Sequence, residues 1–419
     1  MRFAAASFAL FLLCTFGFAQ TNPTSLLEPK SVTIPAVIDH NRVIIDVQVP
    51  LHDGSMQTVH AWVDNGNPDL YMSEHIADLV GGYSCDGQKC FASPPREVVI
   101  GGMEISFAAV KQARVPLRSH GTESVMAAGM SVEINLPSSI LRHYDVLIDF
   151  PGHKFSIGAP GTIHFRGQNC KALINAENGL IQVPSQIEKK KYTLALDLGA
   201  GVSFLSDDLF DKLAAAHADW PHMTGTVGSA NIWGADDETK WKLMRLDRVQ
   251  FGPLFLTGVP VVAMPTTYID FLEKPAGASD AGLLGSNALL NYRIGLDYAH
   301  STVYFEFGRM FSFPEFDVIG LTLRPEDDGR FTILGAPEYE GQPSVPQEPD
   351  GVQAGDHLIA VDGIPVGGST LGQVWNTLGG TPGQERKLTI ERGAKQFVVA
   401  ARVQHFLAEL PEKEKKKKK

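Results

Sequence analysis

The chain repeats one pattern of strands, and this duplication constrains the fold more than any other feature of the sequence. Residues 28–160 and 171–308 contain the same segments in the same order. Each copy has an apolar strand ending in Asp-x-Gly, an amphipathic helix, a strand ending in glycine and a closing strand. Segments that recur in order over this length indicate two copies of one structural unit. We therefore expect two related lobes.

The repeated segments are short and β-branched, and Gly, Pro, Asn and Asp separate them, which is typical of a mainly β fold. Helices are predicted at residues 73–80 and 207–216, and the closing segments are 141–150 and 290–298. Asp149 and Asp297 end the closing strands, and we expect them to accept backbone N–H groups in turns.

A smaller region follows Phe313-Pro314. Residues 320–404 mix strands with a proline-rich loop and one helix, residues 371–378. A chain of 419 residues with 44% apolar content is too long for one ordinary core and suggests two or three domains, and we expect this distinct region to be the third.

The first 19 residues are typical of a cleaved secretory signal. Arg2 precedes an uncharged apolar stretch, and Gly17-Phe18-Ala19 places small residues at a cleavage site. The alternative is a membrane anchor, for which the stretch is short. We expect a secreted or periplasmic protein without a stable membrane span, and a disordered Lys-rich tail at residues 407–419. The sequence does not give the oligomeric state.

The charge and the cysteines exclude some functions. A net charge of -11 disfavours nucleic-acid binding, which needs a basic surface. Export favours a disulfide between Cys85 and Cys90, which a short glycine-containing turn separates, and it leaves Cys170 free in the mature chain. No His-Glu-x-x-His and no pair of Cys-x-x-Cys motifs occurs, so no metal site is predicted.

The two Asp-x-Gly loops carry the main chemical hypothesis. They are Asp64-Asn65-Gly66 and Asp197-Leu198-Gly199, each at the end of an apolar strand. Two carboxyl groups in contact cannot both ionise cheaply, so such a pair shares one proton and activates water between its members.

Residues 28–308 resemble the pepsin-like and retropepsin-like aspartic peptidases. The resemblance rests on the two loops and on residues 283–298, which begin Leu283-Leu284-Gly285; Ala127-Ala128-Gly129 takes the corresponding place in the first lobe. It implies a bilobal β fold, a peptide or protein substrate in the cleft, no metal or cofactor, and peptide-bond hydrolysis by Asp64 and Asp197. Gly66 and Gly199 would let backbone amides approach the carboxylates.

The loops depart from the family pattern between Asp and Gly. The family has Thr or Ser there, whose hydroxyl bonds across the lobe interface, whereas this chain has Asn65 and Leu198. Asparagine can donate and accept, but a leucine side chain can do neither. Ala200 fits the pattern after the glycine and Asn67 does not. Two hypotheses follow: a working peptidase, or an inactive homologue that binds peptides.

The resemblance also locates a flap over the cleft. Residues 81–97 and 225–245 are equivalent in the two copies, and Trp233-Gly234 supplies an aromatic side chain beside a glycine turn. Trp233 is a candidate to cover a ligand, with ordinary packing as the alternative.

Residues 351–363 resemble the core of a bacterial PDZ domain, and the resemblance spans residues 320–404. Such domains bind an extended peptide as an added strand at a sheet edge. The candidate strand is Phe331-Thr332-Ile333-Leu334, with packing alone as the alternative. The resemblance therefore implies a second site for peptides or proteins.

Overall fold

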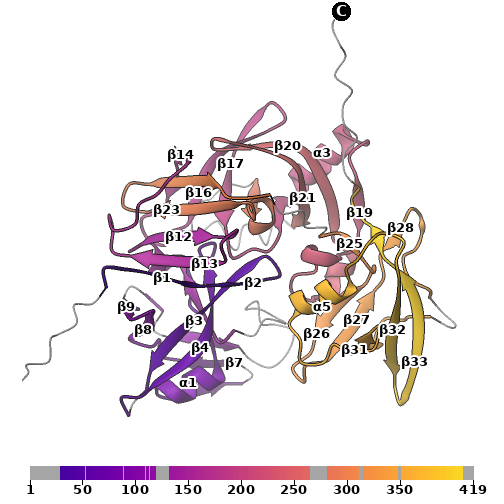
Figure 1. The fold of residues 1–419 in the computed structure, drawn as a ribbon, viewed down its shortest axis with the longest axis horizontal. Helices are drawn as coiled ribbons and strands as arrows, with labels where there is room; N and C mark the ends of the chain where they lie inside the picture. Colours follow the sequence, from indigo (N-terminus) through magenta and orange to yellow (C-terminus); the bar gives the residue numbers. More distant parts are fainter. Residues whose placement is uncertain are drawn as a thin grey trace, which may run out of the picture.

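The computed structural model describes residues 29–51, 53–87, 89–108, 110–112, 114–118, 132–264, 281–310, 315–347 and 351–408. The predicted leader lies outside these residues, as does all of the predicted tail beyond Ala408. Strands make up most of the regular structure, so the mainly β prediction is confirmed. Figure 1 shows two lobes, with the C-terminal strands beside them.

The first lobe is built on a ten-stranded sheet of order β6-β7-β10-β5-β11-β4-β3-β8-β9, with β2 paired to β3. In β3 the buried Ile45, Val47 and Val49 alternate with exposed Asp46 and Gln48, so one face of the strand enters the core. The elements are β2 (Val37–Asp39), β3 (Arg42–Pro50), β4 (Met56–Asp64), β5 (Met72–Ser73), α1 (Glu74–Val80), β6 (Tyr83–Asp86), β7 (Lys89–Ala92), β8 (Glu97–Ile100), β9 (Met103–Ser106), β10 (Val115–Arg118), β11 (Ile134–Pro137) and α2 (Ser138–Leu141).

The second lobe is built on an eight-stranded sheet of order β15-β16-β17-β22-β18-β21-β20-β19. Its elements are β15 (Leu173–Ile174), β16 (Ile181–Ile187), β17 (Lys190–Asp197), β18 (Ser203–Ser206), α3 (Asp207–Ala216), β19 (His222–Thr224), η1 (Gly228–Ala230), η2 (Asp236–Lys240), β20 (Lys242–Phe251), β21 (Leu254–Met264), β22 (Gly282–Gly285) and η4 (Ser286–Ala288). The helices predicted in the two copies are confirmed as α1 and α3, and serine hydroxyls cap both N-termini.

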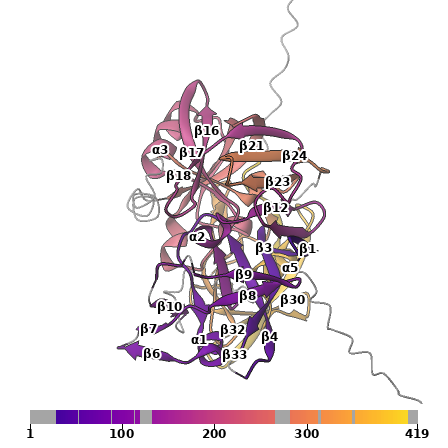
Figure 2. The ribbon, with the colours of Figure 1, turned by 90° about the vertical axis from the view of Figure 1, so that its left-hand side faces the viewer.

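A six-stranded sheet joins the lobes, in the order β1-β13-β12-β23-β24-β14. Its strands are β1 (Ser31–Pro35), β12 (Asp145–Asp149), β13 (Lys154–Gly158), β14 (Gln168–Lys171), β23 (Tyr292–Asp297) and β24 (Thr302–Phe307). The closing strands β12 and β23 pair antiparallel at its centre, between the two lobe sheets in Figure 2. Asp149 and Asp297 accept N–H groups from Gly152 and His300, as predicted for turns.

The C-terminal sheet has the order β26-β27-β30-β32-β33, with β31 paired to β30. Its elements and their neighbours are β25 (Asp317–Val318), β26 (Thr322–Pro325), β27 (Phe331–Gly335), β28 (Glu338–Tyr339), β29 (Gln342–Pro343), β30 (His357–Val361), β31 (Ile364–Pro365), α5 (Leu371–Leu378), β32 (Glu385–Arg392), β33 (Lys395–Arg402) and β34 (Gln404–His405). Helix α5 has the predicted bounds and begins with a capping box of Thr370 and Gln373.

Two apolar cores hold these parts together. One runs through both lobes and the six-stranded sheet, and it includes Ile148 and Ile294. The other joins the second lobe to the C-terminal sheet, so that Phe204 and Ile232 share a core with Leu323. No helix among the described residues is both long and apolar enough to cross a bilayer.

Candidate active site

Both aspartates of the predicted pair stand at the end of a central strand. Asp64 ends β4, whose parallel partner β11 places Pro137 opposite it. Asp197 ends β17, whose parallel partner β22 places Gly285 opposite it. The equivalent positions confirm that the duplication extends to the two loops. They also correct one detail of the sequence analysis. The segment that pairs with the Asp64 strand in the first lobe is Ile134–Pro137, and not residues 127–129. Residues 127–129 lie outside the described residues.

The two loops meet, and each glycine lies against the carboxyl of the other lobe. A Cβ on Gly66 would lie 2.0 Å from Asp197 Cγ, and one on Gly199 would lie 2.5 Å from Asp64 Oδ1. Real Cβ atoms do not come so close, so only glycine fits at either position. Asp64 and Asp197 also line the same cavity. The structure therefore brings together the carboxyl groups that the sequence predicted as a pair.

The two carboxyl groups have different surroundings. Asp197 Oδ1 accepts N–H groups from Gly199 at 2.8 Å and from Ala200 at 2.9 Å, and these bonds favour the ionised form. Asp64 accepts hydrogen bonds from the Gly66 amide and the Asn135 side chain. Its other oxygen, Oδ2, is buried and has no hydrogen-bond partner among the described residues. An unpartnered buried oxygen favours the protonated form of Asp64.

Burial raises the pKa of both carboxyl groups. It raises the pKa of Asp64 well above its usual range, and the neighbouring charge of Asp197 raises it further. Burial also raises the pKa of Asp197, against the amides of Ala200 and Gly199, which lower it. The pair therefore keeps a shared proton at a pH where free carboxyl groups have lost theirs.

Asn65 supplies the connection between the loops. Its side chain is fully buried. Its Oδ1 accepts from Leu198 N at 2.8 Å, and its Nδ2 donates to Leu196 O at 2.7 Å. Leu198 contributes its backbone to this connection, while its side chain lies in the core of the lobes. Ser286 Oγ donates to Leu198 O at 2.8 Å and supports the second loop from behind. Asparagine thus makes two bonds across the interface from one loop.

The cavity in front of the carboxyl groups is narrow and mainly apolar. Its volume is about 80 Å³. Trp233, a predicted flap residue, lines it and stacks on Phe204 with ring centroids 6.3 Å apart. Gly234 does not line it and lies against β26 instead. Arg42, Trp62, Ile232, Met264 and Leu283 also line the cavity.

Arg42 is a site residue that sequence reasoning missed. It begins β3, is 2% exposed and lines the cavity, with its guanidinium 5.7 Å from the Trp62 ring centroid. Its positive charge lowers the pKa of Asp64 and of Asp197. A charged residue at the start of an apolar strand was the available signal, but it did not fix the direction of the side chain.

Asn135 was missed as well. It lies in β11, where its Oδ1 accepts from Tyr71 N at 2.8 Å and its Nδ2 donates to the Asp69 carbonyl at 2.9 Å. These bonds hold the segment after the first loop beside Asp64. The sequence carried no signal for this role because residues 134–137 were not recognised as the partner strand of β4.

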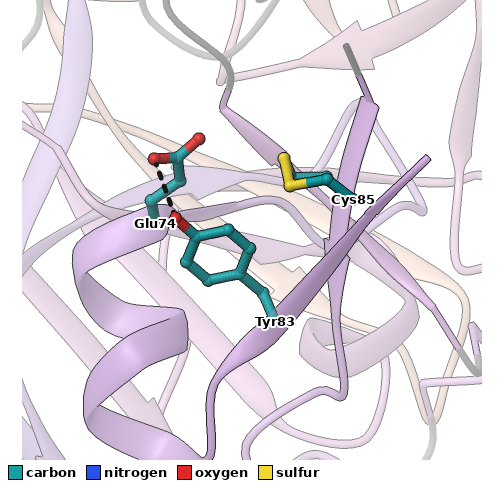
Figure 3. The surroundings of a disulfide bond; sticks show 4 residues. Glu74, Tyr83 and Cys85 are labelled. Carbon is teal, nitrogen blue, oxygen red and sulfur yellow. Dashed lines mark hydrogen bonds between the residues drawn. A yellow bond between two sulfur atoms is a disulfide. The ribbon is translucent and has the colours of Figure 1, made fainter. Parts of the chain in front are cut away.

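The β6–β7 hairpin, which belongs to the segment predicted as the flap of the first copy, lies away from the cavity of the carboxyl groups. The Cys85–Cys90 disulfide is present, as predicted, and joins opposed residues of the β6–β7 hairpin. Figure 3 shows Tyr83 of this hairpin beside Glu74 of α1, and Tyr83 Oη donates to Glu74 Oε2 at 3.4 Å. Strand β6 is the end strand of its sheet, and none of the hairpin residues that the structure describes lines the cavity of the carboxyl groups. Cys170 is a half-buried free thiol.

The predicted peptide-binding strand of the C-terminal sheet is also corrected. β27 carries Phe331–Leu334 and lies between β26 and β30, with Phe331 and Thr332 paired on both sides. The backbone groups of an interior strand are already bonded, so β27 is not a sheet edge. The neighbouring edge strand is β26.

A second cavity, of about 400 Å³, lies between the lobes and the C-terminal part and contains neither aspartate. Glu315 and His40 line it. Burial raises the pKa of Glu315 to about 7 and lowers the pKa of His40 to about 3. Among the described residues, no group of three or more His, Cys, Asp or Glu could hold a metal ion.

Comparison with known proteins gives a family match over part of the second lobe. A family model for aspartyl proteases matches residues 183–288, which include Asp197 and its loop. The structure is similar to the crystal structure of aspartic proteinase from Irpex lacteus, with 12% identity and a TM-score of 0.39, over 68% of this chain and 99% of that chain. No curated protein matches the sequence. The family-model match confirms the predicted resemblance to aspartic peptidases over residues 183–288.

Proposed function

We propose that this protein is an exported aspartic peptidase that hydrolyses peptide bonds with Asp64 and Asp197. The observation that carries the proposal is the reciprocal packing of Gly66 against Asp197 and of Gly199 against Asp64. This arrangement brings two buried carboxyl groups to one cavity, where they share a proton.

The surroundings of the two carboxyl groups assign their resting roles. Asp197 is the base, because two amides stabilise its ionised form, and Asp64 holds the shared proton. Asp197 takes a proton from water, whose oxygen forms a bond to the peptide carbonyl carbon. Asp64 donates its proton to the carbonyl oxygen. Asp197, which now carries the proton from water, donates it to the amine nitrogen as the C–N bond breaks. One hydroxyl of the diol intermediate returns its proton to Asp64 as the product carboxyl group forms, so the pair again holds a single proton on Asp64.

The test is cleavage of a mixed peptide library between about pH 4 and 8, a range that spans the pKa of free and raised carboxyl groups. Asp64→Asn and Asp197→Asn should each abolish cleavage while the protein stays folded. Asp208→Asn, which changes an exposed residue of α3, is the matched control and should cleave normally. Cleavage that survives in both active-site variants would contradict the proposal.

A second candidate is a peptide-binding protein that does not cleave. Leu198 favours this candidate, because a leucine side chain cannot hydrogen-bond across the loops. Among the described residues, the side-chain hydrogen bonds between the two loops come from Asn65. This candidate predicts that the library binds without cleavage at every pH, and that Asp64→Asn leaves binding intact.

Export and the third domain belong to the same proposal. A disulfide at Cys85–Cys90 fits an oxidising compartment, and fractionation of expressing cells would test secretion or periplasmic location. The C-terminal strands and α5 support a PDZ-like domain over residues 320–404, which would engage a peptide or protein at the β26 edge.

A further inference from the structure

The outer edge of β26 already contacts another segment of the same chain, through Asn231. Leu323 N donates to Asn231 Oδ1 at 3.0 Å, and Asn231 Nδ2 donates to Leu323 O at 3.0 Å. A primary amide offers one donor and one acceptor side by side, as a backbone peptide unit does. The Asn231 side chain therefore makes the pair of bonds that one residue of an added strand would make.

The surrounding segment, residues 226–234, follows the same edge. Thr322 Oγ1 donates to Thr226 O at 2.8 Å, one residue before Leu323 in β26. A Cβ on Gly234 would lie 2.6 Å from Arg324 Cα, one residue after it. The segment thus covers β26 from Thr322 to Arg324, and its η1 turn packs beside α5.

A buried carboxylate gives this segment its shape. Glu238 is fully buried. One oxygen accepts from Thr226 Oγ1, Asn231 Nδ2 and Ile232 N, and the other accepts from Trp233 N and Ala235 N. Because five donors converge on one carboxylate, residues 226–235 form a preorganised loop. Its shape presents Asn231 to β26.

The same segment forms part of the cleft wall. Ile232 and Trp233 follow Asn231 directly, and both line the cavity of Asp64 and Asp197. The first lobe holds the segment from its other side, where His40 Nε2 lies 2.7 Å from Asn231 O. Asn231 therefore connects the β26 edge to the cleft wall.

We propose that residues 226–234 are a built-in ligand of the β26 edge, and that Asn231 is a positioning residue for the cleft. The C-terminal sheet fixes Ile232 and Trp233 beside the aspartate pair by holding Asn231. An external peptide can pair with Leu323 only after Asn231 has left. The contact with β26 does not depend on the proposed function, but the effect on substrate does rest on it.

The test compares Asn231→Leu with the native protein by backbone hydrogen exchange. Leucine keeps the side-chain size and removes both bonds to Leu323, together with the bond from Nδ2 to Glu238, which keeps four other donors. Two buried backbone groups then lose their partners, so exchange in residues 320–325 and 226–234 should accelerate together by about tenfold or more. Asn169→Leu, an exposed site in β14, is the matched control and should change neither segment.

Faster exchange confined to residues 226–234, with residues 320–325 unchanged, would overturn the proposal, as would no change in either. If Asn231→Leu does not fold, Thr322→Val supplies the test, because it removes only the bond to Thr226 O and keeps the side-chain shape. It should accelerate exchange in both segments by a few-fold.

Kinetics supply a separate measurement. Asn231→Leu should raise KM for a cleaved peptide more than it lowers kcat, because it shifts the cleft wall and leaves the carboxyl groups in place. A fall in kcat alone would contradict a positioning role. If the native protein cleaves nothing, the peptidase proposal fails, and the exchange experiment still decides the β26 contact.

Discussion

At the scale of single residues, Asn65 determines how the two Asp loops are held. One side chain satisfies a buried N–H of Leu198 and a buried carbonyl of Leu196 from the opposite lobe. Replacing it by leucine leaves both groups without partners, at a cost of about 1–3 kcal/mol each. We expect Asn65→Leu to lower the free energy of unfolding by about 3 kcal/mol, measured by urea denaturation. Asn169→Leu should change it little, and an equal loss in both variants would contradict the role of Asn65.

Arg42 adjusts the acidity of the pair at the same scale. Its charge lowers the pKa of Asp64 and of Asp197, so removing it raises both. In Arg42→Met we therefore expect the loss of cleavage on the alkaline side to move to higher pH. The measurement is kcat/KM against pH, with Arg248→Met at an exposed site as control. An unchanged alkaline limb would show that Arg42 does not act on the pair.

At the scale of elements, the hairpin with the disulfide is separate from the site. A bridge that closes so short a loop contributes about 2 kcal/mol in the chain-entropy model. We expect the double change Cys85→Ser and Cys90→Ser to lower stability by no more than this. Cleavage or peptide binding should persist, because strands β6 and β7 do not line the cavity within the described part of the chain. Loss of activity with retained folding would place the hairpin at the cleft after all.

Sequence reasoning found the elements that local chemistry dictates. Helices α1, α3 and α5 carry a cap residue and an apolar face, and the Asp-x-Gly loops repeat in register. It missed β11 because Ile134–Pro137 has no glycine to match Gly285. It also took β27 for the peptide-binding strand because chain order does not tell which strand is at an edge. Asn135 and Asn231 bond to residues more than 60 positions away, and Arg42 acts on Asp197 of the other lobe as well as on Asp64 of the neighbouring strand. No local pattern reveals such contacts.

At the scale of the whole molecule, the C-terminal sheet and the second lobe pack against each other. They share an apolar core in which Phe204 and Ile232 belong to the lobe and Leu323 to the sheet. Thr370, at the start of α5, also donates to Asp39 of the first lobe at 2.9 Å. Three parts that look separable in the sequence are therefore expected to unfold in a single transition.

Glu315 makes the stability of this assembly depend on pH. It lies between the parts and accepts hydrogen bonds from Asn41 of the first lobe and Ser229 of the second. Burial raises its pKa to about 7 from an ordinary 4.5. Below about pH 4.5 the group is protonated in both the folded and the unfolded state, and no penalty arises. As the pH rises toward 7 the unfolded state loses the proton first, so the folded state loses stability.

The variant Glu315→Gln cannot ionise and should not show this loss. Because the side chain of Glu315 keeps some exposure to solvent, we expect the variant to gain about 1–3 kcal/mol relative to the native protein between pH 4.5 and pH 7.5. Urea denaturation at both pH values measures the difference. Glu338→Gln, at an exposed position, should show no such gain. A difference that stays constant with pH would mean that Glu315 titrates in the folded protein as it does in the unfolded chain.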